Sequence, residues 1–138
     1  MVRGTLLLLA AASVAACGNA SPVAETETPG PREAGVLTIE PQALATRLEA
    51  GEPIQLIDVR TPEEFAQGHI EGAINIPVDE FDPAALPDAV GAQRILYCRS
   101  DRRSGIAAER LAEAGNTTAV HMEGGILAWE DAGLPVQQ

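Results

Sequence analysis

A single cysteine followed by three arginines is the part of this sequence best suited to chemistry. Cys98 comes directly after a short apolar run that ends at Tyr97, and a helical pattern follows a few residues later. The thiolate is the nucleophilic form of cysteine, but an ordinary thiol, with a pKa of about 8.5, is only slightly ionised at pH 7. Helix N-terminal amides and neighbouring arginines favour the anion. The segment therefore predicts a thiolate held in an anion-binding loop.

Residues 98–103, here called the cysteine loop, combine this nucleophile with groups that could bind an anionic substrate. The candidate substrate-binding residues are those that follow the cysteine: Arg99, Ser100, Asp101, Arg102 and Arg103. Three arginines against one aspartate make the loop locally positive, although the whole chain has a formal net charge of −11. This contrast favours a placed anion site.

Other polar residues could support the cysteine loop. Asp58 and Arg60 follow a predicted strand and could point into the site, but a buried ion pair or loop-fastening hydrogen bonds are favoured. We treat them, with Ser104, as supporting residues. His69 and His121 raise the alternative of a cysteine–histidine dyad for peptide hydrolysis. Hydrogen-bonded structural histidines are the favoured interpretation, because no further peptidase feature accompanies them.

The elements that must position these residues are short apolar strands alternating with helices. The expected strands cover 36–39, 54–59, 73–76, 94–97 and 118–122. The expected helices begin at 41, 62, 104 and 125. The first three are stopped by the glycines at 51, 68 and 115, the fourth runs to 132, and a loose, proline-broken helix lies within 79–87. This order predicts an α/β fold, a small doubly wound parallel sheet of about five strands with helices on both faces. Ligands bind such sheets beyond the strands' carboxyl ends, where Cys98 lies.

Two local signals are specific. Thr61 is expected as the N-cap of a helix, with proline next and Glu64 completing a capping box. Gly124, Gly125 and Trp129 are expected to pack the last helix against the sheet, with the indole mostly in the core.

The N-terminal residues have the pattern of an export signal. Arg3 precedes an apolar stretch over 5–16 that is too short for the roughly 20 residues needed to span a bilayer. Residues 14–17, Val-Ala-Ala-Cys, resemble the lipobox of bacterial lipoproteins, in which the cysteine is lipid-modified. We therefore expect lipid attachment at Cys17.

This gives three regions: a lipoprotein signal peptide over 1–16, a lipid-anchored flexible tether over 17–35, and one folded domain over 36–138. We expect the domain in the periplasm or on the outer face of the cell envelope, anchored to a membrane by its lipid alone. The alternatives are an uncleaved hydrophobic anchor, an ordinary signal with a chance cysteine, or a disulfide between Cys17 and Cys98.

Charge and composition argue against other partners. Lysine is absent, and removal of Arg3 with the signal leaves 8 arginines against 20 acidic residues, a formal net charge of −12. Such a surface repels nucleic acid and anionic headgroups. Two histidines and one unmodified cysteine without close spacing do not make a metal site. We expect no metal, no other cofactor, no nucleic acid, and a monomer.

Three segments in this order resemble the rhodanese-type sulfurtransferases. They are residues 57–65 (IDVRTPEEF) with 68–77 (GHIEGAINIP), residues 98–104 (CRSDRRS), and residues 123–129 (EGGILAW). Jointly they form a specific signature, and the resemblance runs from about Val36 to Val136.

The resemblance implies a mechanism. The Cys98 thiolate would take a sulfane sulfur from a small donor such as thiosulfate, become a persulfide, and pass that sulfur to an acceptor such as cyanide or a thiol, including the thiol of a protein. By this likeness Cys98 is the nucleophile, residues 99–103 bind the donor, and Arg103 orients the departing sulfite.

The chain departs from the family at Asp101, where the family often has glycine. Aspartate is among the few residues that tolerate a positive φ, so the loop geometry can survive. Its carboxylate should oppose thiol ionisation and weaken binding of a dianionic donor, which makes thiosulfate less secure as the substrate.

Two other readings remain. Cysteine-based phosphatases and related arsenate reductases resemble this topology but place five residues between cysteine and arginine, whereas four lie between Cys98 and Arg103. A loop this tight should not wrap phosphate. The runner-up is a non-catalytic module of the cell envelope that carries sulfur or binds a protein or an anion.

Overall fold

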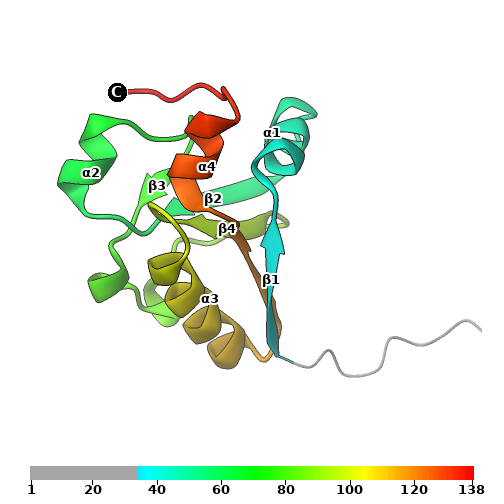
Figure 1. Ribbon diagram of the computed structural model, residues 1–138. Helices are drawn as coiled ribbons and strands as arrows, with labels where there is room; N and C mark the ends of the chain where they lie inside the picture. Colours follow the sequence, from blue (N-terminus) through cyan, green and yellow to red (C-terminus); the bar gives the residue numbers. More distant parts are fainter. Residues whose placement is uncertain (1–33) are drawn as a thin grey trace, which may run out of the picture.

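The computed structural model describes residues 34–138 (Figure 1). The expected signal peptide, the lipid-attachment residue Cys17 with its alternative disulfide, and all but the last two residues of the expected tether lie outside the described residues. The first strand already includes Gly35, so the fold begins one residue before the expected boundary. None of the helices in 34–138 is long and apolar enough to cross a membrane.

The expected parallel sheet is confirmed. Its strands are β1 (Gly35–Ile39), β2 (Ile54–Asp58), β3 (Ile74–Asn75), β4 (Gln93–Tyr97) and β5 (Thr118–Met122), in the spatial order β1-β5-β4-β2-β3. Every neighbouring pair is parallel. All carboxyl ends therefore lie along one edge of the sheet, and the central strand β4 brings Cys98 to that edge.

Helices cover both faces of the sheet. The α-helices are α1 (Pro41–Glu49), α2 (Pro62–Gln67), α3 (Arg102–Gly115) and α4 (Gly125–Asp131), and η1 (Val78–Glu80) and η2 (Pro83–Ala85) are short 3₁₀ helices. α1 and α4 pack together on one face, whereas α3, η1 and η2 lie on the other (Figure 1). The proline-broken helix expected within 79–87 is thus two separate 3₁₀ turns, because proline cannot continue the hydrogen-bonded ladder of a helix.

The alternation of side chains along β4 decides where the cysteine points. Ile95 and Tyr97 belong to the apolar cluster on the α1 and α4 side, and Leu96 and Cys98 belong to the cluster on the α3 side. This is the period of two expected of an extended strand. The side chain of Cys98 therefore packs on the same face as Ala107 and Ala108 of α3.

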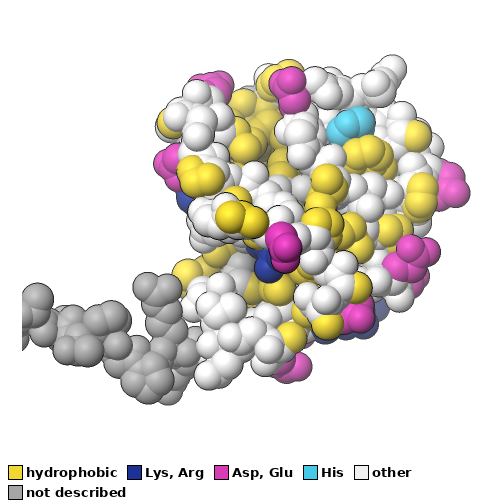
Figure 2. Space-filling model, turned by 180° about the vertical axis from the view of Figure 1, so that it is seen from behind, with side chains coloured by type: hydrophobic (Ala, Val, Ile, Leu, Met, Phe, Trp, Pro, Cys, Tyr) yellow, Lys and Arg dark blue, Asp and Glu magenta, His cyan; other side chains and the backbone are white. Residues whose placement is uncertain are grey.

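Acidic side chains are spread over the surface. Figure 2 shows one face of the molecule, on which carboxylates occur at many separate places between apolar side chains and arginine shows at few. The whole chain carries 20 acidic residues and 9 basic ones, all arginine. An excess of this size repels other polyanions at low ionic strength.

Helix ends follow local sequence signals, with one correction. The capping box is confirmed, because the Thr61 side chain accepts from the Glu64 amide and the Glu64 carboxylate accepts from the Thr61 amide. The end of α3 differs from the expectation. Gly115 is still helical, and Asn116 adopts the left-handed conformation with φ of 43°. Asparagine tolerates that region better than most residues, so it can end a helix as glycine does.

Glu64 also links α2 to α3. Its two carboxylate oxygens accept from the guanidinium of Arg103 at 2.6 and 2.8 Å. Hydrogen bonds from Arg103 lower the pKa of Glu64 to about 2, against the opposing effect of burial. The ion pair joins the helix that follows β2 to the helix that follows the cysteine loop.

A turn of two glycines packs on the cysteine loop. Gly125 has a φ of +59°, and a Cβ built on it would lie 2.5 Å from the carbonyl oxygen of Cys98 and 2.5 Å from the carbonyl carbon of Arg99. A side chain cannot be placed there unless the backbone moves. This close approach lets the first turn of α4 reach the loop.

We predict that Gly125→Ala lowers the free energy of unfolding by about 1–3 kcal/mol more than Gly133→Ala, measured by urea denaturation. Gly133 has a φ of +73° and no atom within 4 Å of a built Cβ. Its substitution by alanine therefore carries the cost of a positive φ but no steric clash. Equal losses in the two variants would show that the contact with the cysteine loop is not tight.

We predict that Glu64→Gln costs up to about 1 kcal/mol of stability at pH 7, and that the difference from the unsubstituted protein shrinks between pH 4.5 and pH 2. A depressed carboxyl pKa stabilises the fold above the ordinary pKa, and this contribution is lost as the pH falls through the folded-state value. Glutamine keeps a side-chain acceptor for the capping box. The matched control is Glu71→Gln, at an exposed position, and a pH-independent difference for Glu64→Gln would contradict the account.

Candidate active site

The cysteine loop is fastened through its carbonyl groups. The Cys98 carbonyl accepts from the Ile126 amide at 2.8 Å, and the Arg99 carbonyl accepts from the Leu127 amide at 3.2 Å. Both donors lie in the first turn of α4, whose approach depends on Gly125. These two bonds orient the loop without using its N–H groups.

The other end of the loop is fastened to α3. This helix begins at Arg102, two residues before the expected start, with Asp101 as its N-cap. The Asp101 carbonyl accepts from the Gly105 amide at 2.8 Å and from the Ser104 hydroxyl at 2.9 Å. Three loop carbonyls are therefore occupied by donors from outside the loop.

The N–H groups of the loop are in the opposite situation. None of the backbone N–H groups of residues 99–104 donates a hydrogen bond to any residue within 34–138. The last three of them are the first N–H groups of α3, which have no acceptor inside a helix. Successive free amides of this kind form an anion-binding concavity. These amides are therefore the backbone donors available to the anion site that the sequence predicts.

Asp101 is accommodated differently from the expectation. Its φ is 162°, an extended conformation that any residue can adopt, so no left-handed backbone explains this residue. Its side chain leaves the helix uncapped and instead accepts from the Gly124 amide at 2.8 Å. This carboxylate is a third connection between the cysteine loop and the start of α4.

Ser104 and His121 support the loop from behind. Ser104 is fully buried, and its hydroxyl lies 2.9 Å from the Asp101 carbonyl and 3.0 Å from Nδ1 of His121. A hydroxyl has one hydrogen, which goes to the carbonyl. Nδ1 of His121 must then carry the proton that it donates to Ser104. Ser104 therefore has the supporting position that the sequence suggested.

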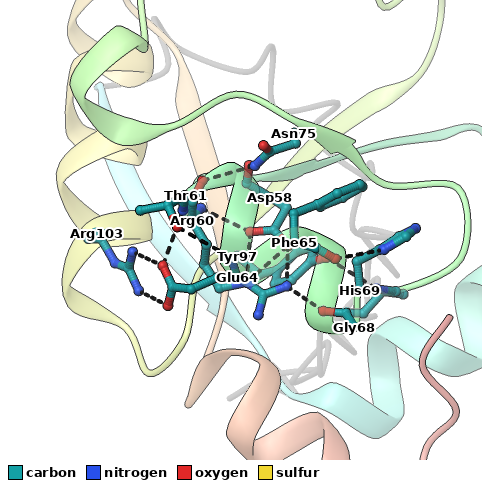
Figure 3. A network of polar contacts seen from close by, with 11 residues as sticks. Asp58, Arg60, Thr61, Glu64, Phe65, Gly68, His69, Asn75, Tyr97 and Arg103 are labelled. Atoms are coloured by element: carbon teal, nitrogen blue, oxygen red, sulfur yellow. Dashed lines mark hydrogen bonds and ion pairs between the residues drawn. The ribbon is translucent and has the colours of Figure 1, made fainter. Parts of the chain in front are cut away.

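Asp58 and Arg60 form the expected buried ion pair (Figure 3). Their closest atoms are 2.6 Å apart, and Arg60 also donates to the carbonyl of Gly68 at 2.7 Å. Burial alone would lower the pKa of Arg60, but the hydrogen bonds and charge of Asp58 raise it above its ordinary value. The guanidinium lies 5.8 Å from the ring centroid of Tyr97, whose hydroxyl accepts from the Ile70 amide. This network fixes the segment after β2.

Arg103 is paired rather than free. Its bond with Glu64 is bidentate, and both side chains are about a quarter exposed (Figure 3). Hydrogen bonding to Glu64 is the main reason why the pKa of Arg103 is raised, and the charge of Cys98 acts in the same direction. Glu64 was identified from the sequence only as a capping residue, because 39 residues separate it from Arg103.

A cleft of about 210 Å³ opens beside the cysteine loop. It is lined by Arg60, Glu64, Gln67, Gly68, Arg99, Ile126, Leu127 and Glu130. Arg99 and Arg102 are exposed and form no ion pair with a residue in 34–138, and Ser100 is also exposed. Cys98 is only 1 % exposed and does not line the cleft. Arg99, which follows Cys98 in the chain, does line the cleft.

The histidines do not form a dyad with the cysteine. Nδ1 of His69 lies 3.0 Å from the Phe65 carbonyl, and the two rings stack at 3.8 Å. His121 is bonded to Ser104. No group of three His, Cys, Asp or Glu side chains in the part of the chain described here is placed to hold a metal ion.

Comparison with known proteins extends this description. The family model for the rhodanese-like domain matches residues 40–132. An uncharacterized protein of Synechocystis is 43 % identical over 99 residues, covering 72 % of this chain and 55 % of that protein. A sulfurtransferase of Allochromatium vinosum is 35 % identical over 98 residues, which cover 71 % of this chain and 92 % of that protein. The thiosulfate sulfurtransferase PspE of Escherichia coli is 45 % identical over 64 residues, which cover 44 % of this chain and 61 % of that protein.

Solved structures agree with the topology. A rhodanese-related protein of Thermoplasma volcanium has a TM-score of 0.63 and 30 % identity, covering 72 % of this chain and 96 % of that one. A rhodanese-like domain protein of Staphylococcus aureus has a TM-score of 0.56 and 33 % identity, and the match covers 73 % of this chain and 98 % of that one. The chain spans little more than half of the Synechocystis protein but nearly all of the Allochromatium sulfurtransferase. With a family model that matches most of the described fold, this chain belongs to the rhodanese-like domain family.

Proposed function

We propose that this protein is a sulfurtransferase that moves sulfane sulfur from a small donor, of which thiosulfate is the simplest, to a thiophilic acceptor through a Cys98 persulfide. One observation carries the proposal. Cys98 directly follows the central strand, the carbonyls of Cys98, Arg99 and Asp101 are occupied, and the N–H groups at 99–104 have no partner within residues 34–138. The family and its relatives named as sulfurtransferases support the same chemistry.

The first step is nucleophilic displacement at sulfur. The Cys98 thiolate attacks the sulfane sulfur of thiosulfate, a new sulfur–sulfur bond forms, and the bond to the sulfonate sulfur breaks with its electron pair. Sulfite leaves, and the enzyme holds a persulfide anion. The free loop amides stabilise negative charge at Cys98 before and after the step. Arg103, held by Glu64, contributes its positive charge at longer range.

The second step transfers the sulfur to the acceptor and regenerates the Cys98 thiolate. Cyanide or a thiolate attacks the terminal sulfur of the persulfide, and the bond to the cysteine sulfur breaks to regenerate the thiolate. Cyanide becomes thiocyanate, whereas a thiol acceptor becomes a persulfide. The near-complete burial of Cys98 shields both forms, so reactants must enter through the mouth of the loop.

The alternative is a rhodanese-like module of the envelope that carries sulfur or binds a protein or an anion without turnover. Two observations favour it. Cys98 is only 1 % exposed, and Arg103 is already paired with Glu64. Repeated turnover separates these functions, because an enzyme forms many equivalents of thiocyanate per Cys98, a sulfur carrier releases at most the one equivalent that it holds, and a binding module takes no sulfur.

We predict that incubation with a sulfane donor adds one sulfur atom to the intact protein, that cyanide removes it as thiocyanate, and that Cys98→Ser abolishes the gain. Intact-mass spectrometry measures the first effect and a colorimetric thiocyanate assay measures the second. Thiosulfate and an organic donor should be run side by side. The absence of a Cys98-dependent gain with every donor would reject the sulfurtransferase in favour of the binding module.

We also propose that the domain is monomeric and is lipid-anchored at Cys17 on the periplasmic or outer face of the cell envelope. The lipobox-like residues 14–17 after the apolar stretch 5–16 support this. We predict that the protein, expressed in a bacterial host with a clickable fatty acid, becomes labelled and sediments with membranes. Cys17→Ser should lose both properties. Labelling that survives this substitution would contradict lipid attachment at Cys17.

A further inference from the structure

We propose that Asp101 is a specificity-determining residue that directs the site toward organic sulfane donors whose reacting end carries a single negative charge, and away from dianionic thiosulfate. This inference rests on the proposed sulfur transfer. It concerns which donor class the Cys98 site accepts. It is carried by the balance of charges around the cysteine loop and by the lining of the adjacent cleft.

The side-chain charges around the site do not sum to a net positive charge. Four guanidinium groups surround the loop and the cleft, and four carboxylates accompany them. The cations are Arg60, Arg99, Arg102 and Arg103, and the anions are Asp58, Glu64, Asp101 and Glu130. Arg60 and Arg103 are held in ion pairs with Asp58 and Glu64. The attraction that remains comes mainly from the free loop amides, which suit one negative charge at Cys98.

The Asp101 carboxylate is fixed to the start of α4, the segment that packs on the cysteine loop. Its Oδ1 accepts from the Gly124 amide at 2.8 Å. The next residue, Gly125, packs directly on the Cys98 carbonyl and on Arg99. The carboxylate therefore cannot swing into solvent without breaking that bond. Its charge acts on any donor at the loop and repels a second negative charge.

The cleft offers contacts that thiosulfate cannot use. Ile126 and Leu127 give it an apolar side next to Arg99, and Gln67 adds a neutral polar group. Leu127 is 38 % exposed and can reach a ligand. An organic group attached to the sulfane sulfur would bury part of this apolar surface. The exposed guanidinium of Arg99 would meet the one negative charge of such a donor.

The chemical step needs no further reactant. With an organic persulfide, the Cys98 thiolate attacks the outer sulfur, the bond to the inner sulfur breaks, and the organic thiolate leaves with the electron pair. With a thiosulfonate, the leaving group is a sulfinate. One negative charge leaves in each case, compared with two for sulfite.

The first test compares two donors that differ in charge at the same sulfur. Methanethiosulfonate carries one negative charge and thiosulfate two. We predict that the unsubstituted protein has the higher kcat/KM for methanethiosulfonate, and that Asp101→Asn reduces this preference about three- to tenfold by improving thiosulfate. Asparagine keeps an oxygen for the Gly124 amide, so the loop stays fastened. The matched control is Glu113→Gln, the same charge change at an exposed position far along α3.

The second test does not depend on sulfur transfer. Iodoacetamide is neutral and iodoacetate is an anion of similar size, and both alkylate the thiolate. The ratio of their rates at Cys98 cancels thiolate fraction and accessibility and reports local charge. We predict that Asp101→Asn raises the iodoacetate-to-iodoacetamide ratio about three- to tenfold and that Glu113→Gln leaves it unchanged.

A third variant tests the cleft. Leu127→Ala should lower the kcat/KM for benzenethiosulfonate relative to methanethiosulfonate, because the larger group loses its apolar contact. An unchanged alkylation ratio in Asp101→Asn, or a preference for thiosulfate in the unsubstituted protein, would overturn the donor assignment. Failure of every donor to load sulfur would instead reject the proposed function, whatever the alkylation ratio shows.

Discussion

The cysteine loop is held by its carbonyl groups, and the rest of the site depends on that constraint. The carbonyls of Cys98 and Arg99 are occupied by amides of α4, and the carbonyl of Asp101 by donors of α3. A peptide whose carbonyl is held by a donor turns its N–H the opposite way, and the N–H groups of residues 99–104 have no partner within residues 34–138. The missing side chain at Gly125 makes this possible, because any Cβ there would strike the loop.

Charge pairing explains why we propose the loop amides, more than Arg103, as the anion-binding groups. From the sequence the loop is positive, but folding brings Glu64 against Arg103 and places Asp101 on the Gly124 amide. The side-chain charges largely compensate each other, whereas backbone dipoles cannot be titrated or neutralised by a proton. A strongly acidic protein can in this way keep a local anion site without a basic patch.

Local signals were predictable, and contacts distant in the chain were not. The Thr61 capping box and the placement of Cys98 at the carboxyl end of a strand follow from short patterns and from the alternation of strands and helices, whereas the central position of that strand comes from the structure. The pairing of Glu64 with Arg103 requires two helices from different crossovers to meet, which periodicity does not encode. The conformation of Asp101 differs from the expected left-handed backbone for a related reason. The partner of its carboxylate, the Gly124 amide, lies 23 residues away in the chain, so no local pattern indicates the contact.

The buried Cys98 thiol and the N–H groups without partners both belong to the cysteine loop. The N–H groups at 99–104 have no acceptor within the described residues, so an anion held at the loop would supply one. In the proposed cycle the Cys98 thiolate would supply one charge, and the persulfide would keep that single charge while moving it to the outer sulfur. Each form in the proposed cycle would therefore be a monoanion beside the same free amides. A dianionic donor would add charge that these amides must hold against Asp101, and this is the basis of the proposed discrimination by donor charge.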